Sequence, residues 1–255
     1  METKKCFIAL IDLMGFSDYV KKESSENVYK ILENFINIPK LFKIDSFNYN
    51  LNIFSDTIII STPIENDSKT MDRVQFDEFL LYINTIQMAN ITMFGVLPVR
   101  GGITIGDFYT NQKDMLFGKG LIDAHETECK LACYPRIIIN KEIYTPEASK
   151  KAIIRINDVM KKTGIKAAPY NERKYLMRRD FDGLLHCNYL CSLNRIGVGW
   201  VDNATAYIKA HRDFIVSNIK KASNKPSVIV KYQWIKTYHN WFCEGCEIFR
   251  EYIIE

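Results

Sequence analysis

Continuous apolar, β-branched stretches near the N-terminus predict buried strands, and an aspartate stands beside each of them. The first stretch covers residues 6–12 and ends in Asp12, and two more, over residues 48–54 and 57–62, lie on either side of Ser55-Asp56. Short apolar runs bounded by turn residues are typical of strands that are covered on both faces. We therefore predict one strand that ends at Asp12 and a tight hairpin that carries Asp56 in its turn.

Helical periodicity appears between and after these strands. Apolar residues recur at helical spacing over 23–41, 72–94 and 121–132, and further strands are predicted over 99–105 and 135–140. The resulting order, β-α-β-β-α-β followed by α-β, is that of the ferredoxin-like split unit, in which helices cover one face of an antiparallel sheet. We therefore predict an α+β fold. In that topology the first strand lies beside the hairpin, so that Asp12 and Asp56 approach one another.

From residue 142 onward the pattern is mainly helical. Helices are predicted over 147–161, 203–222 and 225–249, around a strand-like region at 174–185. No linker, low-complexity stretch or internal repeat separates this part from the preceding residues. We expect residues 1–141 to form a catalytic core and residues 142–255 to form a helical C-terminal elaboration packed on that core.

Composition and charge narrow the classes of function. With 255 residues, 47% hydrophobic and 25% charged, the chain can form an ordinary globular core. The net charge is +4 and the basic residues are scattered, so no nucleic-acid partner is favoured, whereas a small anionic substrate is compatible. No apolar run approaches the ~20 residues of a membrane helix, and we expect no membrane association.

Cysteine usage favours a reduced, cytoplasmic protein. The seven cysteines are irregularly spaced, and the N-terminus leads into a predicted strand rather than a secretory core. Cys243 and Cys246 have the spacing of a metal or redox pair, but buried free thiols are the favoured interpretation because no second pair lies nearby. The four histidines show no ligand spacing, and we expect them to be structural or surface residues.

Asp12 and Asp56 together indicate a cation site. Either aspartate alone is compatible with a cap or a turn. Two carboxylates that converge beside buried strands need a counter-charge, and Mg²⁺ or Mn²⁺ shared with substrate phosphates commonly supplies it. Arg100 opens an apolar strand that continues with Gly101 and Gly102, which suits bidentate phosphate binding, with an ordinary ion pair as the alternative.

The chain resembles the core of the class III nucleotide cyclase catalytic domain in residues 7–17, 54–61 and 100–106, followed by Phe117-Gly118-Lys119-Gly120-Leu121. Within that superfamily it is most similar to the bacterial pyrimidine cyclases of the anti-phage defence type called Pycsar. The segments that suggest this subgroup are Ala124-His125-Glu126-Thr127-Glu128, Ala132-Cys133-Tyr134-Pro135-Arg136-Ile137, Asp180-Phe181-Asp182-Gly183, and Lys231-Tyr232-Gln233-Trp234 with Tyr238-His239-Asn240. The resemblance extends over nearly the whole chain.

The resemblance implies a metal-dependent catalytic site. Asp12 and Asp56 match the two metal-binding aspartates, and Leu13 would offer a backbone carbonyl, for two Mn²⁺ or Mg²⁺ ions per site. The residues that would hold the triphosphate are Gly15, Phe16, Ser17 and Arg100. The implied reaction joins the ribose 3′-hydroxyl to the α-phosphorus and releases pyrophosphate.

Two positions that read the base in purine cyclases, where they are charged or polar, correspond to Asn52 and Met115. A neutral amide can pair with a pyrimidine edge, and a less polar pocket disfavours a purine whose ring nitrogens would lack partners. We therefore expect UTP or CTP to be converted to 3′,5′-cyclic UMP or CMP. The resemblance further implies a homodimer with metal aspartates from one protomer and the base-reading strand from the other, activation by phage infection, and a separate effector protein that reads the product.

Two departures from the family pattern leave alternatives open. Ile122 stands where purine cyclases have a ribose-orienting Asn, and Glu126 stands where they have a transition-state Arg. The replacement candidates for that arginine are Lys119, Lys130 and Arg136. A catalytically degenerate, nucleotide-sensing dimer and a purine cyclase are therefore alternatives, while a palm-type polymerase is disfavoured because no basic groove or fingers region is visible.

Overall fold

The computed structural model describes residues 2–42, 48–64, 73–111, 115–141, 143, 173, 175–195 and 200–255. The N-terminal elements are β1 (Lys4–Leu13), α1 (Phe16–Val20), α2 (Ser25–Leu41), β2 (Asn50–Phe54), β3 (Thr57–Pro63), α3 (Arg73–Ala89), the π-helix η1 (Asn90–Phe94), β4 (Val99–Thr110), β5 (Leu116–Phe117), α4 (Lys119–Leu131) and β6 (Ile137–Ile139). The C-terminal elements are β7 (Met177–Arg179), β8 (Leu185–Cys187), the 3₁₀ helix η3 (Tyr189–Arg195), α6 (Trp200–Lys221), α7 (Pro226–Glu244) and the 3₁₀ helix η4 (Glu247–Tyr252).

The sheet confirms the predicted α+β fold. Its strand order is β2-β3-β1-β4-β6-β8-β7, with β5 paired to β4 outside this path. β1 is antiparallel to β3 and to β4, and β6 joins β4 in parallel. The part β2-β3-β1-β4 is the order that a ferredoxin-like split unit requires, and it places the β2–β3 hairpin directly beside β1.

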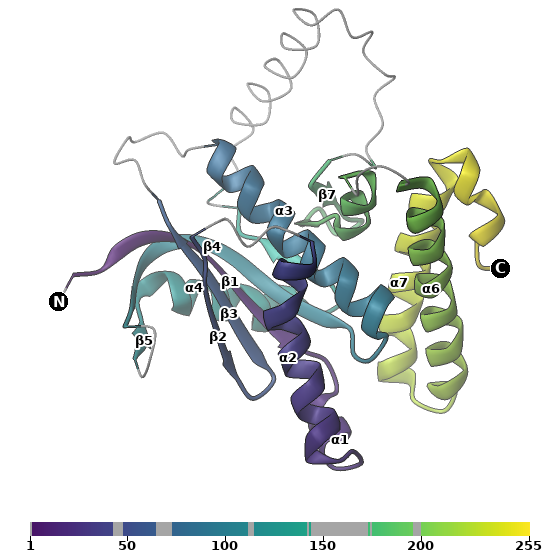
Figure 1. The fold of residues 1–255 in the computed structure, drawn as a ribbon, viewed down its shortest axis with the longest axis horizontal. Coiled ribbons are helices and arrows are strands. Elements are labelled where there is room, and N and C mark those ends of the chain that lie inside the picture. The colour runs from purple at the N-terminus through teal and green to yellow at the C-terminus, as the bar shows by residue number, and fades with distance from the viewer. Residues whose placement is uncertain are drawn as a thin grey trace, which may run out of the picture.

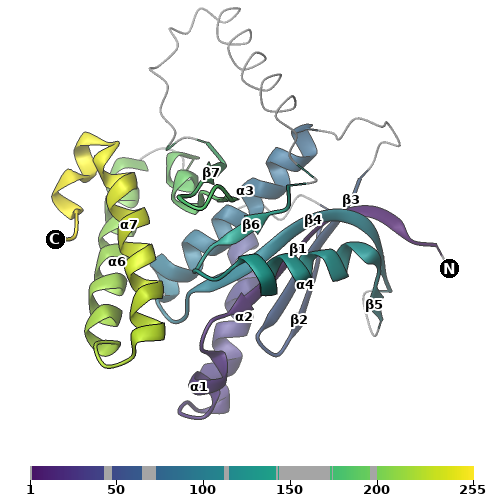
Figure 2. The same ribbon diagram turned by 180° about the vertical axis from the view of Figure 1, so that it is seen from behind.

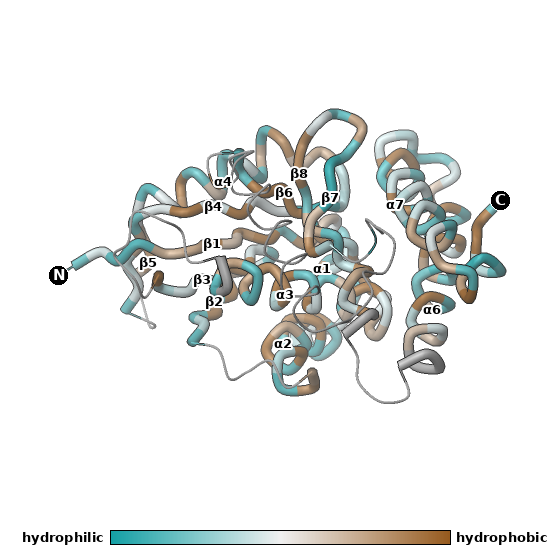
Figure 3. Tube along the Cα trace, turned by 90° about the horizontal axis from the view of Figure 1, so that it is seen from above, coloured by the Kyte–Doolittle hydropathy of each residue, from teal (hydrophilic) through white to brown (hydrophobic). Residues whose placement is uncertain are grey.

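Helices cover both faces of this sheet, because α4 adds a layer to the split unit. α2 and α3 lie on one face (Figure 1), and α4 lies on the other, as the view from behind shows (Figure 2). The three layers are visible from above (Figure 3). Alternate residues of β1 serve the two faces: Phe7 and Ile11 belong to the apolar cluster with α2 and α3, and Ile8 belongs to the cluster under α4. This explains the continuous apolar run of β1.

Glycines in β4 allow the backbone of α4 to approach closely. A Cβ on Gly102 would lie 2.4 Å from the carbonyl oxygen of Ala124, and one on Gly106 would lie 2.7 Å from the Cα of Gly120. These strand glycines therefore mark a place where a helix backbone approaches the sheet closely. The result is a fixed position for α4 across β1 and β4.

The C-terminal residues extend the sheet and add a helical pair. β8 joins the sheet through the pairing of Ile138 with His186. α6 and α7 pack together beside the end of α3 (Figure 1), and their apolar cluster includes Met88 and Ile91 from α3 and η1. The predicted helix over 147–161 lies outside the described residues. The division at residues 141 and 142 stays a prediction.

Several element boundaries differ from the sequence-based expectation. The helix predicted over 72–94 ends at Ala89 and continues as a π-helix, and the helix predicted over 225–249 ends at Glu244 before a 3₁₀ helix. β5 was not predicted, because two residues carry no readable periodicity. Among the helices that the structure describes, none combines the length and apolar character needed to cross a membrane.

Candidate active site

The two aspartates lie at the same end of the sheet, as the predicted topology requires. Asp12 is the penultimate residue of β1 and is paired with Thr57 of β3 and with Arg100 of β4. Asp56 occupies the β2–β3 turn, and the Leu13 N–H donates a hydrogen bond to its carbonyl oxygen at 3.0 Å. The backbones that carry both carboxylates are therefore adjacent. Their role as metal ligands stays a prediction.

Ser55 makes the hairpin tight enough to hold Asp56 in this place. It adopts a φ of 56°, in the left-handed region, between the paired residues Phe54 and Thr57. A positive φ in a two-residue loop is what a hairpin needs to match the twist of its strands. The loop brings Asp56 beside the end of β1 in this way.

Arg100 holds Asp12 and contacts a second acid, Glu128. The Arg100 Nε–H donates to Asp12 Oδ2 at 2.9 Å, and the same nitrogen lies 2.8 Å from Glu128 Oε1. Because the single Nε hydrogen is directed at Asp12, the contact with Glu128 is an ion pair, and Glu128 Oε1 is a buried oxygen without a hydrogen bond. Burial alone would lower the pKa of Arg100, but the hydrogen bond to Asp12 and the charges of Glu128 and Asp12 raise it.

Glu128 is the functional-site residue that the sequence analysis missed. Its side chain is 4% exposed, against 32% for Arg100 and 21% for Asp12. The signal was available: Glu128 shares the buried face of α4 with Ala124 and Thr127, and a carboxylate on that face requires a cation. The carboxylates beside Arg100 therefore come from β1 and α4.

Two groups at this end of the sheet are available to a ligand. The Asp56 carboxylate makes no hydrogen bond or ion pair with any residue that the structure describes, and it is only partly buried. Arg100 donates to Asp12 through Nε, and its terminal nitrogens make no hydrogen bond to the residues that the structure describes. A free carboxylate beside a partly exposed one is a donor set that fits a hard divalent cation.

The turn after β1 is exposed and is built around Gly15. Gly15 has a φ of 85° and begins α1, and the Tyr19 N–H donates to its carbonyl oxygen at 3.1 Å. Gly15 and Ser17 are exposed, whereas the Phe16 side chain is buried in the apolar cluster. Phe16 could therefore contact a phosphate through its backbone only.

The two predicted base-reading residues do not meet within one chain. Asn52 is on the edge strand β2, paired with Ile59, and its Oδ1 is buried without a hydrogen bond. Met115 precedes β5 and is 48% exposed, and its N–H donates to Asn111 Oδ1 at 3.0 Å. β5 pairs with β4, which β3 and β1 separate from β2.

The residues at the two positions that depart from the purine-cyclase pattern, Ile122 and Glu126, lie on the exposed surface of α4. Ile122 is 61% exposed. Glu126 pairs with Lys130 at 2.8 Å, and Lys119 pairs with Asp123 at 2.7 Å. Both lysines are exposed and lie on α4, the helix that carries Glu128. Lys119 and Lys130 therefore stay candidates for the role of the transition-state arginine.

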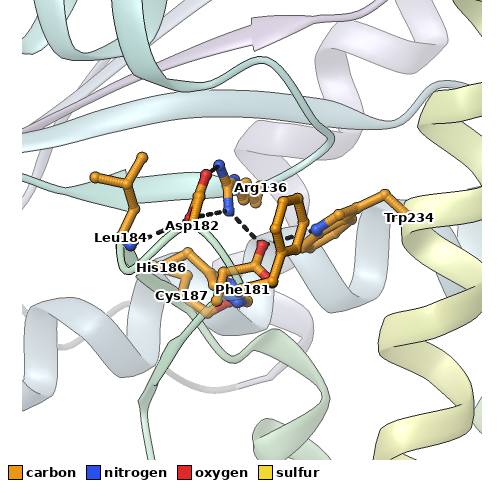
Figure 4. Close-up of polar contacts among 8 residues, drawn as sticks. Arg136, Phe181, Asp182, Leu184, His186, Cys187 and Trp234 are labelled. Atoms are coloured by element: carbon orange, nitrogen blue, oxygen red, sulfur yellow. Dashed lines mark hydrogen bonds and ion pairs between the residues drawn. The ribbon is translucent and has the colours of Figure 1, made fainter.

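Arg136 is placed differently, in a buried network that connects three parts of the chain (Figure 4). Its side chain is 1% exposed and forms ion pairs with Asp180 and Asp182, and Trp234 Nε1–H donates to Asp180 Oδ2 at 2.8 Å. The hydrogen bond from Arg136 lowers the pKa of Asp182. Arg136 therefore joins the loop before β6 to the β7–β8 turn and to α7, which argues against its use as a mobile phosphate-binding group.

Comparisons with known proteins give structural likenesses only. No family model and no curated protein matches the chain. In part it is similar to the guanylyl cyclase Cya2 (15% identity, 56% of this chain and 78% of that chain, TM-score 0.40). It is also similar to the adenylyl cyclase CyaB from P. aeruginosa (13%, 56% and 80%, TM-score 0.40) and to the guanylate cyclase domain of RhGC from Catenaria anguillulae in complex with GTP (14%, 55% and 80%, TM-score 0.40). Because identities and TM-scores are low, these structural likenesses carry no part of the function proposed below.

Proposed function

We propose that this chain is a metal-dependent nucleotide cyclase that converts UTP or CTP to 3′,5′-cyclic UMP or CMP and pyrophosphate, in cytoplasmic anti-phage signalling with a separate effector protein. The observation that carries the proposal is the convergence of Asp12, Asp56 and Arg100 at one end of the sheet. The pyrimidine substrate and the defence role rest on the resemblance of the sequence to the Pycsar cyclases.

The proposed division of labour follows from the contacts. Asp12, Asp56 and the Leu13 carbonyl would hold two Mn²⁺ or Mg²⁺ ions, which supply Lewis acidity to the 3′-hydroxyl and neutralise the leaving pyrophosphate when bound. Arg100 keeps Asp12 oriented through Nε and would bind phosphate oxygens through its terminal nitrogens. Backbone groups of the Gly15 turn would complete the phosphate site.

Asn52 supports a polar base contact. Its Oδ1 is buried and unpaired, and a buried acceptor without a partner costs about 1–3 kcal/mol. A rotation that brings the Asn52 amide to the surface would remove this cost and would let the amide pair with a pyrimidine edge. In the proposed homodimer, Asn52 of one protomer would contact the base of a nucleotide bound at the metal site of the other. Phe54 and Ile122 are 79% and 61% exposed and would supply apolar surface for the contact between protomers.

Product analysis with the four ribonucleotides tests the proposal. Purified protein is incubated with each triphosphate and Mn²⁺, with and without a lysate of phage-infected cells, and products are resolved by mass spectrometry. We expect cyclic UMP or cyclic CMP, and none with a chelator or with Asp56→Asn. A dominant cyclic AMP or cyclic GMP product would contradict the pyrimidine assignment.

A nucleotide-sensing dimer without catalysis is the second candidate. It is favoured by the two departures from the purine-cyclase pattern. Ile122 stands in place of the ribose-orienting Asn, and Glu126 stands in place of the transition-state Arg and is paired with Lys130. The two candidates differ in product: the sensor binds a triphosphate and Mg²⁺ through the same aspartates but forms no cyclic nucleotide under any condition. Equilibrium binding of labelled UTP beside the product assay separates them.

A further inference from the structure

Three side chains on α4 form a compact set of metal-ligating atoms, of which only Glu128 also contacts the candidate active site, as an ion-pair partner of Arg100. We name this set, His125, Glu128 and Cys129, the α4 cluster. One ligand atom from each residue lies within 4.8 Å of the other two. His125 and Cys129 are exposed, and Glu128 is buried. The cluster combines an imidazole, a thiol and a carboxylate, a donor set that is different in kind from the two aspartates of the candidate active site.

The helix fixes the spacing of the α4 cluster. His125 and Cys129 are one helical turn apart, so that their side chains share one face, and Glu128 adjoins them three residues after His125. Cys129 Sγ lies 3.4 Å from His125 Nε2 and 3.1 Å from Glu128 Oε2. Tetrahedral zinc, with Zn–S of about 2.3 Å and Zn–N or Zn–O of about 2.1 Å, separates such ligand atoms by about 3.6 Å. The two sulfur distances therefore differ from this separation by about 0.2 and 0.5 Å, and the ligand atoms of His125 and Glu128 lie within 4.8 Å of one another.

The Glu128 carboxylate contacts Cys129 of the cluster and has few hydrogen-bond donors around it. Oε1 is a buried oxygen in ion-pair contact with Arg100 but without a hydrogen bond, and Oε2 accepts only the weak thiol donor of Cys129. Arg100 thus orients the carboxylate through Oε1, the oxygen that does not contact Cys129, as outer-shell partners orient metal ligands. Oε1 therefore has a charge partner, whereas Oε2 has only a weak donor and is the oxygen that a metal ion could take.

We propose that the α4 cluster binds one Zn²⁺ through His125, Glu128 Oε2 and the Cys129 thiolate, with a fourth position open to solvent. The thiol proton is released to solvent when the ion binds, and the thiolate and carboxylate charges balance the ion. Sulfur and imidazole select zinc over magnesium, whereas the carboxylates of Asp12 and Asp56 favour the hard ion. Zinc binding is measured directly, so this inference does not rest on the proposed cyclase activity.

Cobalt serves as the spectroscopic probe of this site. Reduced protein, freed of metal with a chelator, is titrated with Co²⁺ in excess Mg²⁺, and the sulfur-to-cobalt charge-transfer band is recorded with the visible bands of tetrahedral Co²⁺. We expect both to saturate at one equivalent per chain and to disappear when Zn²⁺ is added. Binding should weaken as the pH falls, because the metal ion and the proton compete for the Cys129 sulfur.

Substitutions assign the ligands. Cys129→Ser should remove the charge-transfer band, and His125→Ala should keep that band but weaken Co²⁺ and Zn²⁺ binding at least tenfold, since even outer-shell losses cost 10–100-fold. The matched control is Cys133→Ser, an exposed thiol outside the cluster, which should bind like the wild type. Circular dichroism and melting of the metal-free variants establish that each is folded, as expected for exposed positions.

Three results would overturn the proposal. One is a wild-type protein without a charge-transfer band at any Co²⁺ concentration. Another is a band that survives in Cys129→Ser, and the third is a band that is lost in Cys133→Ser alone. Zinc should also raise the melting temperature of the wild type but not that of Cys129→Ser, because only a ligand bound to the folded state stabilises it.

Discussion

A buried histidine pair makes the stability of this protein dependent on pH. His211 Nδ1 and His239 Nδ1 are 2.9 Å apart, the Tyr189 hydroxyl lies 2.9 Å from His211 Nε2, and His239 Nε2 lies 2.9 Å from the carbonyl oxygen of Tyr252. With two neutral imidazoles these three contacts are satisfied when Tyr189 donates to His211, His211 donates to His239, and His239 donates to the carbonyl oxygen of Tyr252. Both imidazoles are then neutral, and a proton added at His239 Nδ1 would face the Nδ1–H of His211 in this arrangement.

The magnitude follows from the pKa values. Burial lowers the pKa of His239 from 6.5 to about 4, and burial followed by the charge of His239 lowers that of His211. Between pH 6.5 and pH 4 the unfolded chain therefore binds more protons, so that stability is present above pH 6.5 and is lost as the pH falls. For His239 alone, lowering the pH from 7.5 to 5.0 costs about 2 kcal/mol of unfolding free energy.

Urea unfolding at pH 7.5 and 5.0 tests this reasoning. His239→Gln retains an N–H near the Tyr252 carbonyl but does not titrate, and we expect its pH-dependent loss to be smaller than that of the wild type by about 2 kcal/mol. His125→Asn, at an exposed histidine, is the matched control and should keep the wild-type loss in the presence of a chelator. An unchanged loss in His239→Gln would refute the neutral pair.

Three further predictions concern the site and its support. Asp56→Asn should abolish cyclic nucleotide formation but change the unfolding free energy by less than about 0.5 kcal/mol, because its carboxylate has no polar partner among the described residues. Asp12→Asn should lose activity and also weaken the ion pair with Arg100. Urea unfolding is measured beside the product assay, and a markedly unstable Asp56→Asn would contradict this reasoning. Arg136→Met should destabilise the protein by about 3–5 kcal/mol, since it leaves two carboxylates without their buried partner, and a thermal melt equal to the wild type would contradict the structural role. Gly102→Ala should cost about 1–3 kcal/mol by forcing α4 away from β4, and a melting temperature at or above that of the wild type would show that the helix can move freely.

Much of the core could be predicted because its signals are local. An apolar run covered on both faces identified β1, a turn between two such runs identified the β2–β3 hairpin, and helical periodicity identified α2, α3 and α4. The element order then led to the split topology and to the approach of Asp12 and Asp56. The boundaries of α3 and α7 were less accurate, because the π- and 3₁₀-helical segments that follow them are too short for their different periodicity to show in the sequence.

The charge partners were decided by tertiary structure. Arg136 was considered a candidate for the role of the transition-state arginine, but its position at the β7–β8 turn pairs it with Asp180 and Asp182. Glu128 received no role from the sequence, and the packing of α4 on β4 places it against Arg100. Such partners come from distant segments, and the sequence pattern of one segment contains no information about which opposite charge will be buried beside it.

The sequence by itself determined the strands, the helices, the α+β class and the meeting of two aspartates at one end of the sheet, because hydrophobic periodicity and short turns act over a few residues. Only the tertiary structure decided that Arg100 lies between Asp12 and Glu128, that Asn52 Oδ1 is buried without a partner, and that His211 and His239 share one hydrogen bond. Burial determines whether a polar group is hydrated, paired or left unsatisfied, and burial results from how all the layers pack together.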